Sequence, residues 1–345
     1  MNYIPSRPGD GQLPGGGLAA HRGPLPAGDL PQCLPAGIGG RLPGRLLGID
    51  AGGSASRAVV VEDRQVVERL SAPPMNALLT EALPERLLGL IKPARPSAVG
   101  IGMPGLRSGD DAAALASVLT RRAGCPVYVS SDGTTAWLGA FGGAPGAVVY
   151  AGTGSGASGC DGRRWARAGG HGFLLGDEGS AYWIGRAAVS AALRWEDGMD
   201  GGSAALHRAV TAELGPDLAG LVREVHSRPG DRSRLAGLAR LVTGLAAEDE
   251  TARRIAREAA EQLAALAEAI RAALGPLPVA GLGGVFGAPV IWEAFAELTG
   301  AVRPLAPPAV GAALLAGSPQ AEAARAGHAL PMMPAGRCRR EGNTG

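Results

Sequence analysis

Two apolar segments, each running into a glycine-rich turn, constrain the fold of this chain more than any other feature. Residues 46–50 lead through Ala51-Gly52-Gly53-Ser54 to a valine-rich run over 57–62. Residues 147–150 enter Gly152-Thr153-Gly154-Ser155-Gly156 in the same way. An order of strand, glycine turn and strand predicts a β-hairpin. A hairpin therefore opens each half of the chain, and the sequence predicts two related lobes with a ligand cleft between them.

The pattern around the first hairpin predicts a mixed α/β sheet. A third strand extends the hairpin, and leucines then recur at helical spacing. The expected elements are strands over 46–50, 57–62 and 66–70, a helix over 77–91, a strand over 98–103, a helix over 110–122, a strand over 126–130 and a helix over 134–141. This order places helices on the faces of the sheet.

The second half repeats the hairpin and then becomes largely helical. Its hairpin turns at Asp161-Gly162, where Arg163 and Arg164 are expected at a solvated tip. The remaining expected elements are a return strand over 165–168, a helix over 180–194, a mostly helical stretch over 202–274, a strand over 278–280 and helices over 289–298 and 310–316.

The expected domain organisation follows from these elements. Residues 45–145 form an N-terminal lobe, 146–305 form a C-terminal lobe, and 306–319 form a closing helix that packs back on the first lobe. Proline and glycine interrupt residues 1–44 throughout, and no apolar core of a signal peptide is present. Residues 1–44 and 320–345 are therefore expected to be disordered.

Composition excludes several classes of function. The chain has 345 residues, of which 46% are hydrophobic, enough for a sizeable core in about two domains. A net charge of +2 and 4% aromatic residues do not fit a nucleic-acid binder. No apolar run approaches the ~20 residues of a membrane span. The scattered cysteines favour free thiols in a reducing cytoplasm; they are Cys33, Cys125, Cys160 and Cys338.

Three glycine turns have the composition of nucleotide contacts. Consecutive glycine amides can surround an anion closely. In the first turn Gly52, Gly53 and Ser54 offer such donors, and Asp50 before them can orient a metal ion or its water. Thr153, Gly154 and Ser155 repeat the arrangement, so that two facing hairpins would clamp a polyphosphate. Gly283 and Gly284 follow a strand and fit the base or ribose.

Two aspartates have both a catalytic and a structural interpretation. Asp132 stands where a strand gives way to a helix, so it can accept a proton from an attacking hydroxyl or merely cap the helix. Asp177 lies in a glycine-rich loop over 169–180, where it can bind sugar hydroxyls or simply favour the start of the next helix. The residues alone leave both pairs of alternatives open.

These segments, in this order, resemble the N-acetylglucosamine kinase and BadF/BadG/BcrA/BcrD-type ATPase family. The resemblance covers about residues 46–315. Asp50–Ser54, Thr153-Gly154 and 283–286 are similar to its phosphate-1, phosphate-2 and adenosine motifs. Its most specific part is the signature Leu175-Gly176-Asp177-Glu178-Gly179-Ser180-Ala181-Tyr182-Trp183-Ile184-Gly185.

The resemblance implies a two-lobed, actin-like ATPase fold of the ribonuclease H type, with ATP and Mg²⁺ in the cleft. It implies that Asp132 is the catalytic base, that Asp50 orients the metal largely through water, and that the acceptor is an amino sugar phosphorylated at its 6-hydroxyl. A homodimer is common in the family. The sugar-binding residues implied by the motifs are Asn76, Asp132, Thr153, Gly154, Gly170 and Asp177.

This chain departs from the family in three segments. Ala51 and Ser54 replace a glycine and a threonine in the first motif, His171 stands where tryptophan is frequent, and Gly102-Met103-Pro104-Gly105 differs from the usual small-residue loop. Two alternatives to a kinase therefore remain: an ATPase that activates a dehydratase through an iron–sulfur cluster, and a sugar or nucleotide sensor without turnover.

Overall fold

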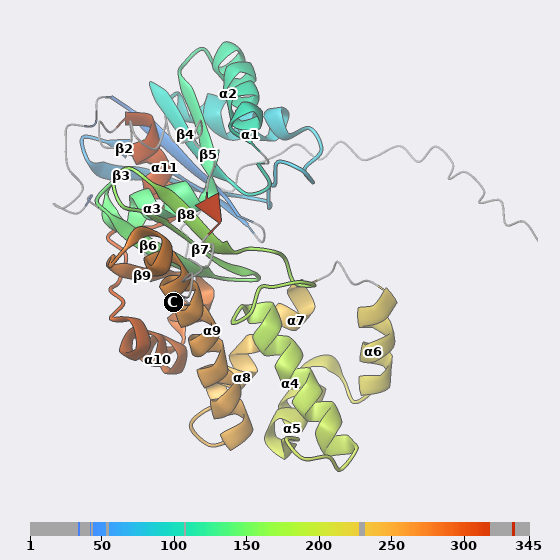
Figure 1. Ribbon diagram of the computed structural model, residues 1–345. Coiled ribbons are helices and arrows are strands. Elements are labelled where there is room, and N and C mark those ends of the chain that lie inside the picture. The colour runs from blue at the N-terminus through green and yellow to red at the C-terminus, as the bar shows by residue number, and fades with distance from the viewer. Residues whose placement is uncertain are drawn as a thin grey trace, which may run out of the picture.

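The computed structural model describes Leu34, Leu42 and residues 44–52, 55–106, 108–227, 232–317 and 333–334. Its first sheet belongs to the N-terminal half and its second sheet to the C-terminal half (Figure 1). The first half contains β1 (Leu46–Ala51), β2 (Ser56–Glu62), β3 (Gln65–Ala72), α1 (Leu83–Ala94), β4 (Ala98–Met103), α2 (Gly109–Ala123), β5 (Val127–Ser131) and α3 (Asp132–Phe141).

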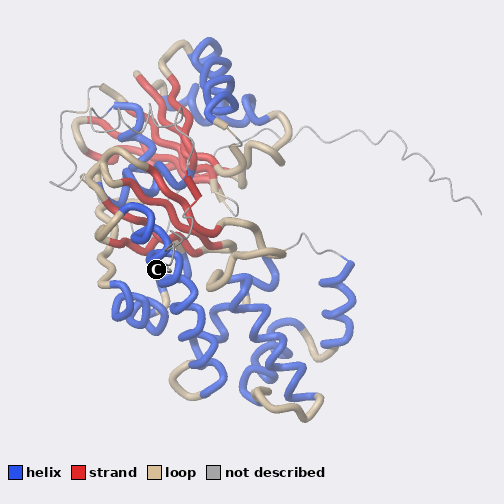
Figure 2. Tube along the Cα trace, viewed as in Figure 1, coloured by secondary structure: helices blue, strands red, loops and turns tan. Residues whose placement is uncertain are grey.

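The second half contains β6 (Gly146–Ala151), β7 (Ser155–Cys160), β8 (Trp165–Gly169), α4 (Ala181–Glu196), α5 (Ala204–Leu214), α6 (Leu218–Ser227), α7 (Ser233–Gly237), α8 (Ala239–Leu245), α9 (Glu250–Leu274), β9 (Val279–Leu282), a 3-10 turn (Gly284–Gly287), α10 (Pro289–Thr299), α11 (Pro308–Gly317) and β10 (Met333–Pro334). The helices α4 to α8 gather at the end of the molecule farthest from the first sheet, as the colouring by secondary structure shows (Figure 2).

The two sheets share the topology of a four-strand core, and they differ in the fifth strand, which lies beside β4 in the first sheet and beside β8 in the second. Their strand orders are β3-β2-β1-β4-β5 and β10-β8-β7-β6-β9. In each, an antiparallel three-strand meander is joined by a strand that runs parallel to its first member: β4 beside β1, and β9 beside β6. The predicted pair of related lobes is confirmed. The carboxyl ends of these parallel strands are where open α/β sheets place their ligands.

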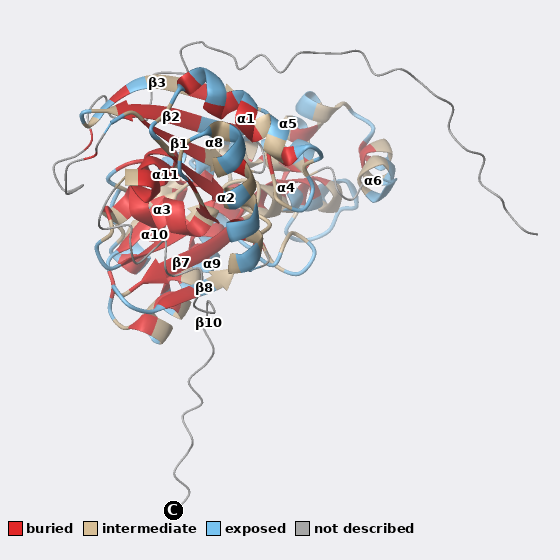
Figure 3. Cartoon of the chain, turned by 90° about the horizontal axis from the view of Figure 1, so that it is seen from above, coloured by how far each residue is buried: buried red, intermediate tan, exposed pale blue. Residues whose placement is uncertain are grey.

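Close packing of α11 on the first sheet depends on glycine. A Cβ atom at Gly48 of β1 would lie 2.1 Å from the carbonyl oxygen of Ala309, and one at Gly100 of β4 would lie 1.8 Å from that of Ala312. The helix backbone thus rests directly on the strands. Nearly all of α11 and α3 is buried (Figure 3), so these two helices form the interior between the lobes.

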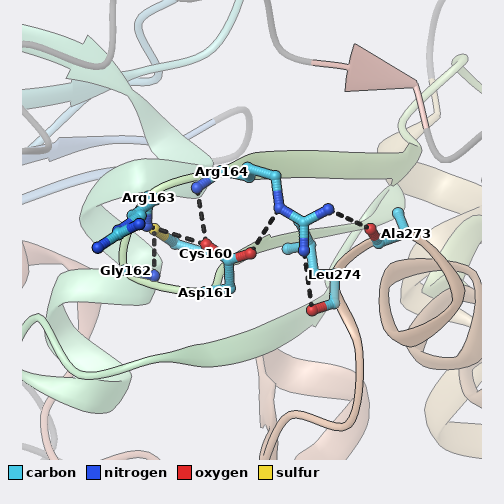
Figure 4. Close-up of polar contacts among 7 residues, drawn as sticks. All are labelled: Cys160, Asp161, Gly162, Arg163, Arg164, Ala273 and Leu274. Atoms are coloured by element: carbon cyan, nitrogen blue, oxygen red, sulfur yellow. Dashed lines mark hydrogen bonds and ion pairs between the residues drawn. The ribbon is translucent and has the colours of Figure 1, made fainter.

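The second lobe buries the long helix α9 against β7 and β8. Alanine and leucine side chains on one face of α9 enter its core, in the pattern of an amphipathic helix. Arg164 holds the far end of this helix, since its guanidinium lies 3.4 Å from the carbonyl oxygens of Ala273 and Leu274 and 2.7 Å from Asp161 (Figure 4). Arg163 and Arg164 are both exposed in this turn, so the expectation of a solvated tip is confirmed, and Arg164 in addition contacts the end of α9.

One helix begins later than expected. The leucine spacing predicted a helix from residue 77, but α1 starts at Leu83. The Asn76 side chain accepts a hydrogen bond from the amide of Leu78 at 2.8 Å, and the amide of Thr80 donates to the Asn76 carbonyl. Asparagine offers the backbone this turn as an alternative to helix. Pro84 then favours the first helical turn.

Parts of both terminal stretches belong to the folded structure. Leu34 and Leu42, within the expected disordered segment 1–44, are buried in one cluster with residues of β1, β2 and α11. The amide of Leu34 donates to the carbonyl of Arg64. Met333–Pro334 pairs with β8 as β10. These residues differ from the expectation, and the rest of 1–43 and 318–345 lies outside the described residues.

The glycine contacts of α11 generate a stability prediction. Replacing Gly100 with alanine forces a methyl group into the backbone of α11, so we expect the free energy of unfolding to fall by about 2 kcal/mol or more. Gly89 of α1 is the matched control, because nothing lies within 4 Å of its Cβ position. Gly89→Ala should be neutral or stabilise by up to about 1 kcal/mol. Urea unfolding measures both, and equal stability of the two variants would contradict this packing.

Candidate active site

A cleft of about 620 Å³ lies where strand ends of the two sheets face each other. Asp50 and Gly52 come from the end of β1 and the turn after it, Asp132 from the end of β5, and Gly152 from the turn after β6. Its other residues are Arg57, Ala136, Tyr150, Ala151, Gly281, Leu282, Gly283, Gly284, Phe286, Gly287, Arg303, Pro304, Leu305, Ala306, Pro307 and Pro308. Residues widely separated in the sequence therefore form one site.

Two carboxylates interact at one end of this cleft. Burial and, to a smaller extent, the nearby Asp132 together raise the pKa of Asp50 to about 7, against the opposing effect of Arg57, its partner across the hairpin. Burial also raises the pKa of Asp132, against a 2.9 Å hydrogen bond from the amide of Gly133. Neighbouring carboxylates in a poorly solvated site favour a proton or a bound cation.

The alternative role of Asp132, that of the residue capping the following helix, is taken by its neighbour. Ser131 is the N-cap of α3, and its hydroxyl oxygen accepts a hydrogen bond from the amide of Thr134 at 3.2 Å. Asp132 is the first residue of the helix and lines the cleft. Its carboxylate is therefore not needed as a cap and is placed where it can accept a proton from a ligand.

Only some of the glycine-turn residues predicted to bind phosphate are seen to line the cleft. Gly52 and Gly152 line the cleft, as do Gly283 and Gly284. Gly53 and Ser54 lie outside the described residues. A Cβ atom at Gly283 would lie 2.3 Å from the carbonyl oxygen of Ala151, so glycine is required for this approach of the two strand ends.

The Ser155 hydroxyl has another partner. It donates to the carbonyl of Glu178 at 2.6 Å and is buried at the start of β7. Ser155 thereby fastens the loop over 169–180 to the second sheet. Because its hydroxyl is occupied, we expect neighbouring backbone groups, rather than the Ser155 side chain, to contact a phosphate at this turn.

The sequence-predicted sugar residues of the second lobe come together. Asp177 is 5% exposed and accepts a 3.3 Å hydrogen bond from the amide of Ser155. A Cβ atom at Gly154 would lie 2.7 Å from the Asp177 carboxylate, and the Gly170 amide donates to the Ser155 carbonyl at 3.0 Å. Thr153 precedes this group in the turn after β6.

The capping alternative for Asp177 is also filled by another residue. The hydroxyl oxygen of Ser180 accepts a hydrogen bond from the amide of Trp183 and caps α4. Asp177 has a φ of 60°, a left-handed conformation that costs free energy for a residue other than glycine. Burial raises the pKa of Asp177, and the Ser155 amide and Arg232 oppose that shift. A strained, buried carboxylate without a capping role is a candidate ligand site.

Asn76 lies in the other lobe. Its loop is fastened to the loop after β4, because the Ala77 amide donates to the Pro104 carbonyl at 3.0 Å. A Cβ atom at Gly105 would lie 2.3 Å from the Asn76 side-chain oxygen. Among the described contacts none joins Asn76 to Asp177, so the structure does not bring these two together.

Sequence reasoning missed three residues of the site. Tyr150 lines the cleft, and both Asp132 and Asp177 raise the pKa of its phenol, as burial does more strongly. Arg303 also lines the cleft, with its guanidinium 3.6 Å from the centre of the Trp292 ring. Arg232 lies 3.7 Å from Asp177. No motif marks any of them, since each is a single residue brought in by the fold.

The carboxylates suit a cation that arrives with a ligand. Among the described residues, no group of three or more histidine, cysteine, aspartate or glutamate side chains could hold a metal ion. Asp50 and Asp132 supply only two carboxylates. Mg²⁺ retains several waters and is commonly bound by one or two carboxylates together with substrate phosphates. The pair therefore fits Mg²⁺ bound with a nucleotide, with Asp50 as its protein ligand or the acceptor of its water.

The raised pKa of Asp50 generates a prediction about stability and pH. Because the folded pKa of about 7 lies above the ordinary 3.8, folding favours the protonated form, and that stabilisation is lost as pH rises through 7. We expect Asp50→Asn to raise the free energy of unfolding by about 2 kcal/mol near pH 8 and by far less near pH 4. Urea unfolding at both pH values measures the difference. An equal gain at both would contradict the burial of this charge.

Comparison with known proteins agrees with the geometry. The model of the BadF/BadG/BcrA/BcrD ATPase family matches residues 47–316. The structure of a candidate N-acetylglucosamine kinase from Chromobacterium violaceum is 27% identical, with a TM-score of 0.63 over 79% of this chain and 98% of that one. No curated protein matches the sequence.

Two further structures show the fold alone. A candidate N-acetylglucosamine kinase from Porphyromonas gingivalis is 21% identical, with a TM-score of 0.65 over 78% of this chain and 97% of that one. A ROK family glucokinase from Streptomyces griseus, solved with glucose and AMPPNP, is 20% identical, with a TM-score of 0.50 over 74% and 88%. The chain has the two-lobed actin-like ATPase fold and belongs to the BadF/BadG/BcrA/BcrD ATPase family.

Proposed function

We propose that this protein is an ATP-dependent kinase that phosphorylates an amino sugar, N-acetylglucosamine or glucosamine, at its 6-hydroxyl. The observation that carries the proposal is the position of Asp132, a carboxylate with a raised pKa in the wall of the cleft, whose capping role is filled by Ser131. Membership of an ATPase family and the similarity to a candidate N-acetylglucosamine kinase at 27% identity support it.

The proposed reaction uses residues from both lobes. The sugar lies against Asp177, Gly154, Gly170 and Thr153, with Asn76 approaching from the first lobe. Asp132 accepts the proton of the attacking hydroxyl, and its raised pKa makes it a stronger base than an exposed aspartate. Backbone amides of the glycine turns stabilise charge on the transferred phosphoryl group.

ATP occupies the cleft lengthwise in this proposal. Its phosphates lie near Asp50, Gly52 and Gly152, and its base lies near Gly283 and Gly284. Mg²⁺, when bound beside Asp50, neutralises phosphate charge. The guanidinium of Arg303, already stacked on Trp292, presents a flat cation at the base end, which suits a stacked purine.

The two cysteines in the described part of the chain favour a kinase over a dehydratase activator. Burial raises the thiol pKa of both Cys125 and Cys160, which disfavours the thiolate that an iron–sulfur ligand needs. Cys125 packs against the core of the first lobe, and Cys160 belongs to a different buried cluster. Free thiols also suit the reducing cytoplasm that we propose as its location. None of the described helices is long and apolar enough to cross a membrane.

The function is tested by ADP release from purified protein with Mg²⁺ and ATP in the presence of individual sugars. The panel contains glucosamine, N-acetylglucosamine, glucose, N-acetylmannosamine and a control without sugar. We expect one of the two proposed amino sugars to stimulate release most. Hydrolysis at the same rate with and without sugar, in a protein that contains iron, would contradict the kinase and favour the activator; ATP binding without turnover would favour a sensor.

The role of Asp132 is tested by Asp132→Asn. The amide cannot accept the hydroxyl proton, so we expect kcat to fall by about 10²–10⁴ while ATP binding is retained. Asp63→Asn is the matched control, because Asp63 is exposed in the turn between β2 and β3 with a φ of 46°, which asparagine tolerates well. Near-normal turnover of Asp132→Asn would remove this residue from the mechanism.

A further inference from the structure

Arg232 reaches the proposed sugar site from the helical part of the second lobe. It precedes α7 directly, and its guanidinium lies 3.7 Å from the Asp177 carboxylate. The same group lies 5.5 Å from the centre of the Phe173 ring, which packs edge-on against Tyr182 at 5.2 Å. One arginine thus contacts both the carboxylate and an aromatic ring of the loop over 169–180.

The surroundings of Asp177 make the positive charge of Arg232 important for keeping the Asp177 carboxylate ionised. The carboxylate is 5% exposed, and it accepts hydrogen bonds from the backbone amides of Ser155 and Gly172, which carry no net charge. The other titratable groups near it are Glu178 beside it in the chain and Tyr150 on β6, and His171 lies in the same loop. Glu178 opposes the charge on Asp177, whereas Arg232 supports it. A buried carboxylate with no cation beside it tends to take up a proton.

We propose that Arg232 is a positioning residue of the sugar site, holding Asp177 in the orientation and charge state in which it accepts hydrogen bonds from sugar hydroxyls. This inference rests on the proposed function. The pair is spaced for such a role, because 3.7 Å is longer than a charge-assisted hydrogen bond. The carboxylate is held near the cation and is not locked into a bidentate pair that a sugar would have to break.

A second arginine nearby shows what a merely structural pair looks like. Arg234, two residues further along in α7, is paired with Glu224, and both side chains are 40% exposed. Exposed pairs of this kind contribute little. Arg232 instead pairs with a carboxylate that solvent barely reaches. Arg234→Gln is therefore a matched control for Arg232→Gln: both remove one arginine from the same helical turn.

The kinetic test compares these variants with the sugar that the protein phosphorylates. We expect Arg232→Gln to raise KM for the sugar about tenfold, with kcat and KM for ATP changed much less. Arg232→Lys should restore part of the loss. Because removal of the cation raises the pKa of Asp177, the increase in KM should be larger near pH 6 than near pH 8. Equal kinetics of Arg232→Gln and Arg234→Gln, or an increase independent of pH, would overturn the inference.

A second measurement needs no substrate. In protein labelled with ¹³C at aspartate carboxyl carbons, NMR titration follows Asp177 directly, and Asp177→Asn assigns its signal. We expect the midpoint to move to higher pH in Arg232→Gln and to stay in place in Arg234→Gln. An unmoved midpoint would overturn the role of Arg232 even if a sugar is phosphorylated. If no sugar is phosphorylated, the proposed function fails separately, and a moved midpoint still supports the control of Asp177 by Arg232.

Discussion

The close contact of α11 with its neighbours determines where the two carboxylates of the cleft lie. Gly48 and Gly100 let the helix rest on β1 and β4, and a Cβ atom at Gly311 would lie 1.9 Å from the Thr135 carbonyl oxygen of α3. The strand β1 ends near Asp50, and α3 begins with Asp132. Because one buried helix packs against both elements, the separation of the two carboxylates depends on backbone contacts that cannot adjust without steric overlap.

This arrangement of the site lowers the stability of the folded protein. Asp50 and Asp132 raise each other's free energy in a poorly solvated cleft, and Asp177 adopts a left-handed backbone conformation. Strain and unfavourable charge of this kind persist only where the surrounding structure imposes them. A bound cation and polyphosphate would offset the repulsion between Asp50 and Asp132. A sugar would bind to Asp177 in its left-handed conformation. The same features that destabilise the folded protein are therefore those to which our proposal assigns ligand binding.

The fold could be predicted from the sequence because its signals are local. Glycine turns after apolar runs specify the two hairpins, and leucine spacing specifies the helices, except where the side chain of Asn76 delayed α1. The alternatives at Asp132 could not be separated in this way. Ser131 and Asp132 are adjacent and both are good caps, and only the geometry shows that the serine fills that role.

The remaining site residues could not be predicted because they come from distant segments. Arg232 reaches the loop of Asp177 through the packing of α7, and Arg303 reaches the cleft by stacking on Trp292 of α10. Neither position carries a motif, and each becomes meaningful only when the second lobe is assembled. Local pattern therefore predicts the glycine turns of the cleft, whereas the charged groups around them follow from tertiary structure.

The central claim is that a phosphoryl group is transferred from ATP to a sugar hydroxyl, and not to water, in the cleft beside Asp50 and Asp132. The most direct measurement uses ATP whose γ-phosphoryl oxygens carry the heavy isotope of oxygen, with mass spectrometry of the products formed with glucosamine or N-acetylglucosamine. The account predicts a sugar phosphate that contains the labelled phosphoryl group joined through the sugar's own unlabelled oxygen. Labelled inorganic phosphate as the product, in equal amount with and without sugar, would contradict it.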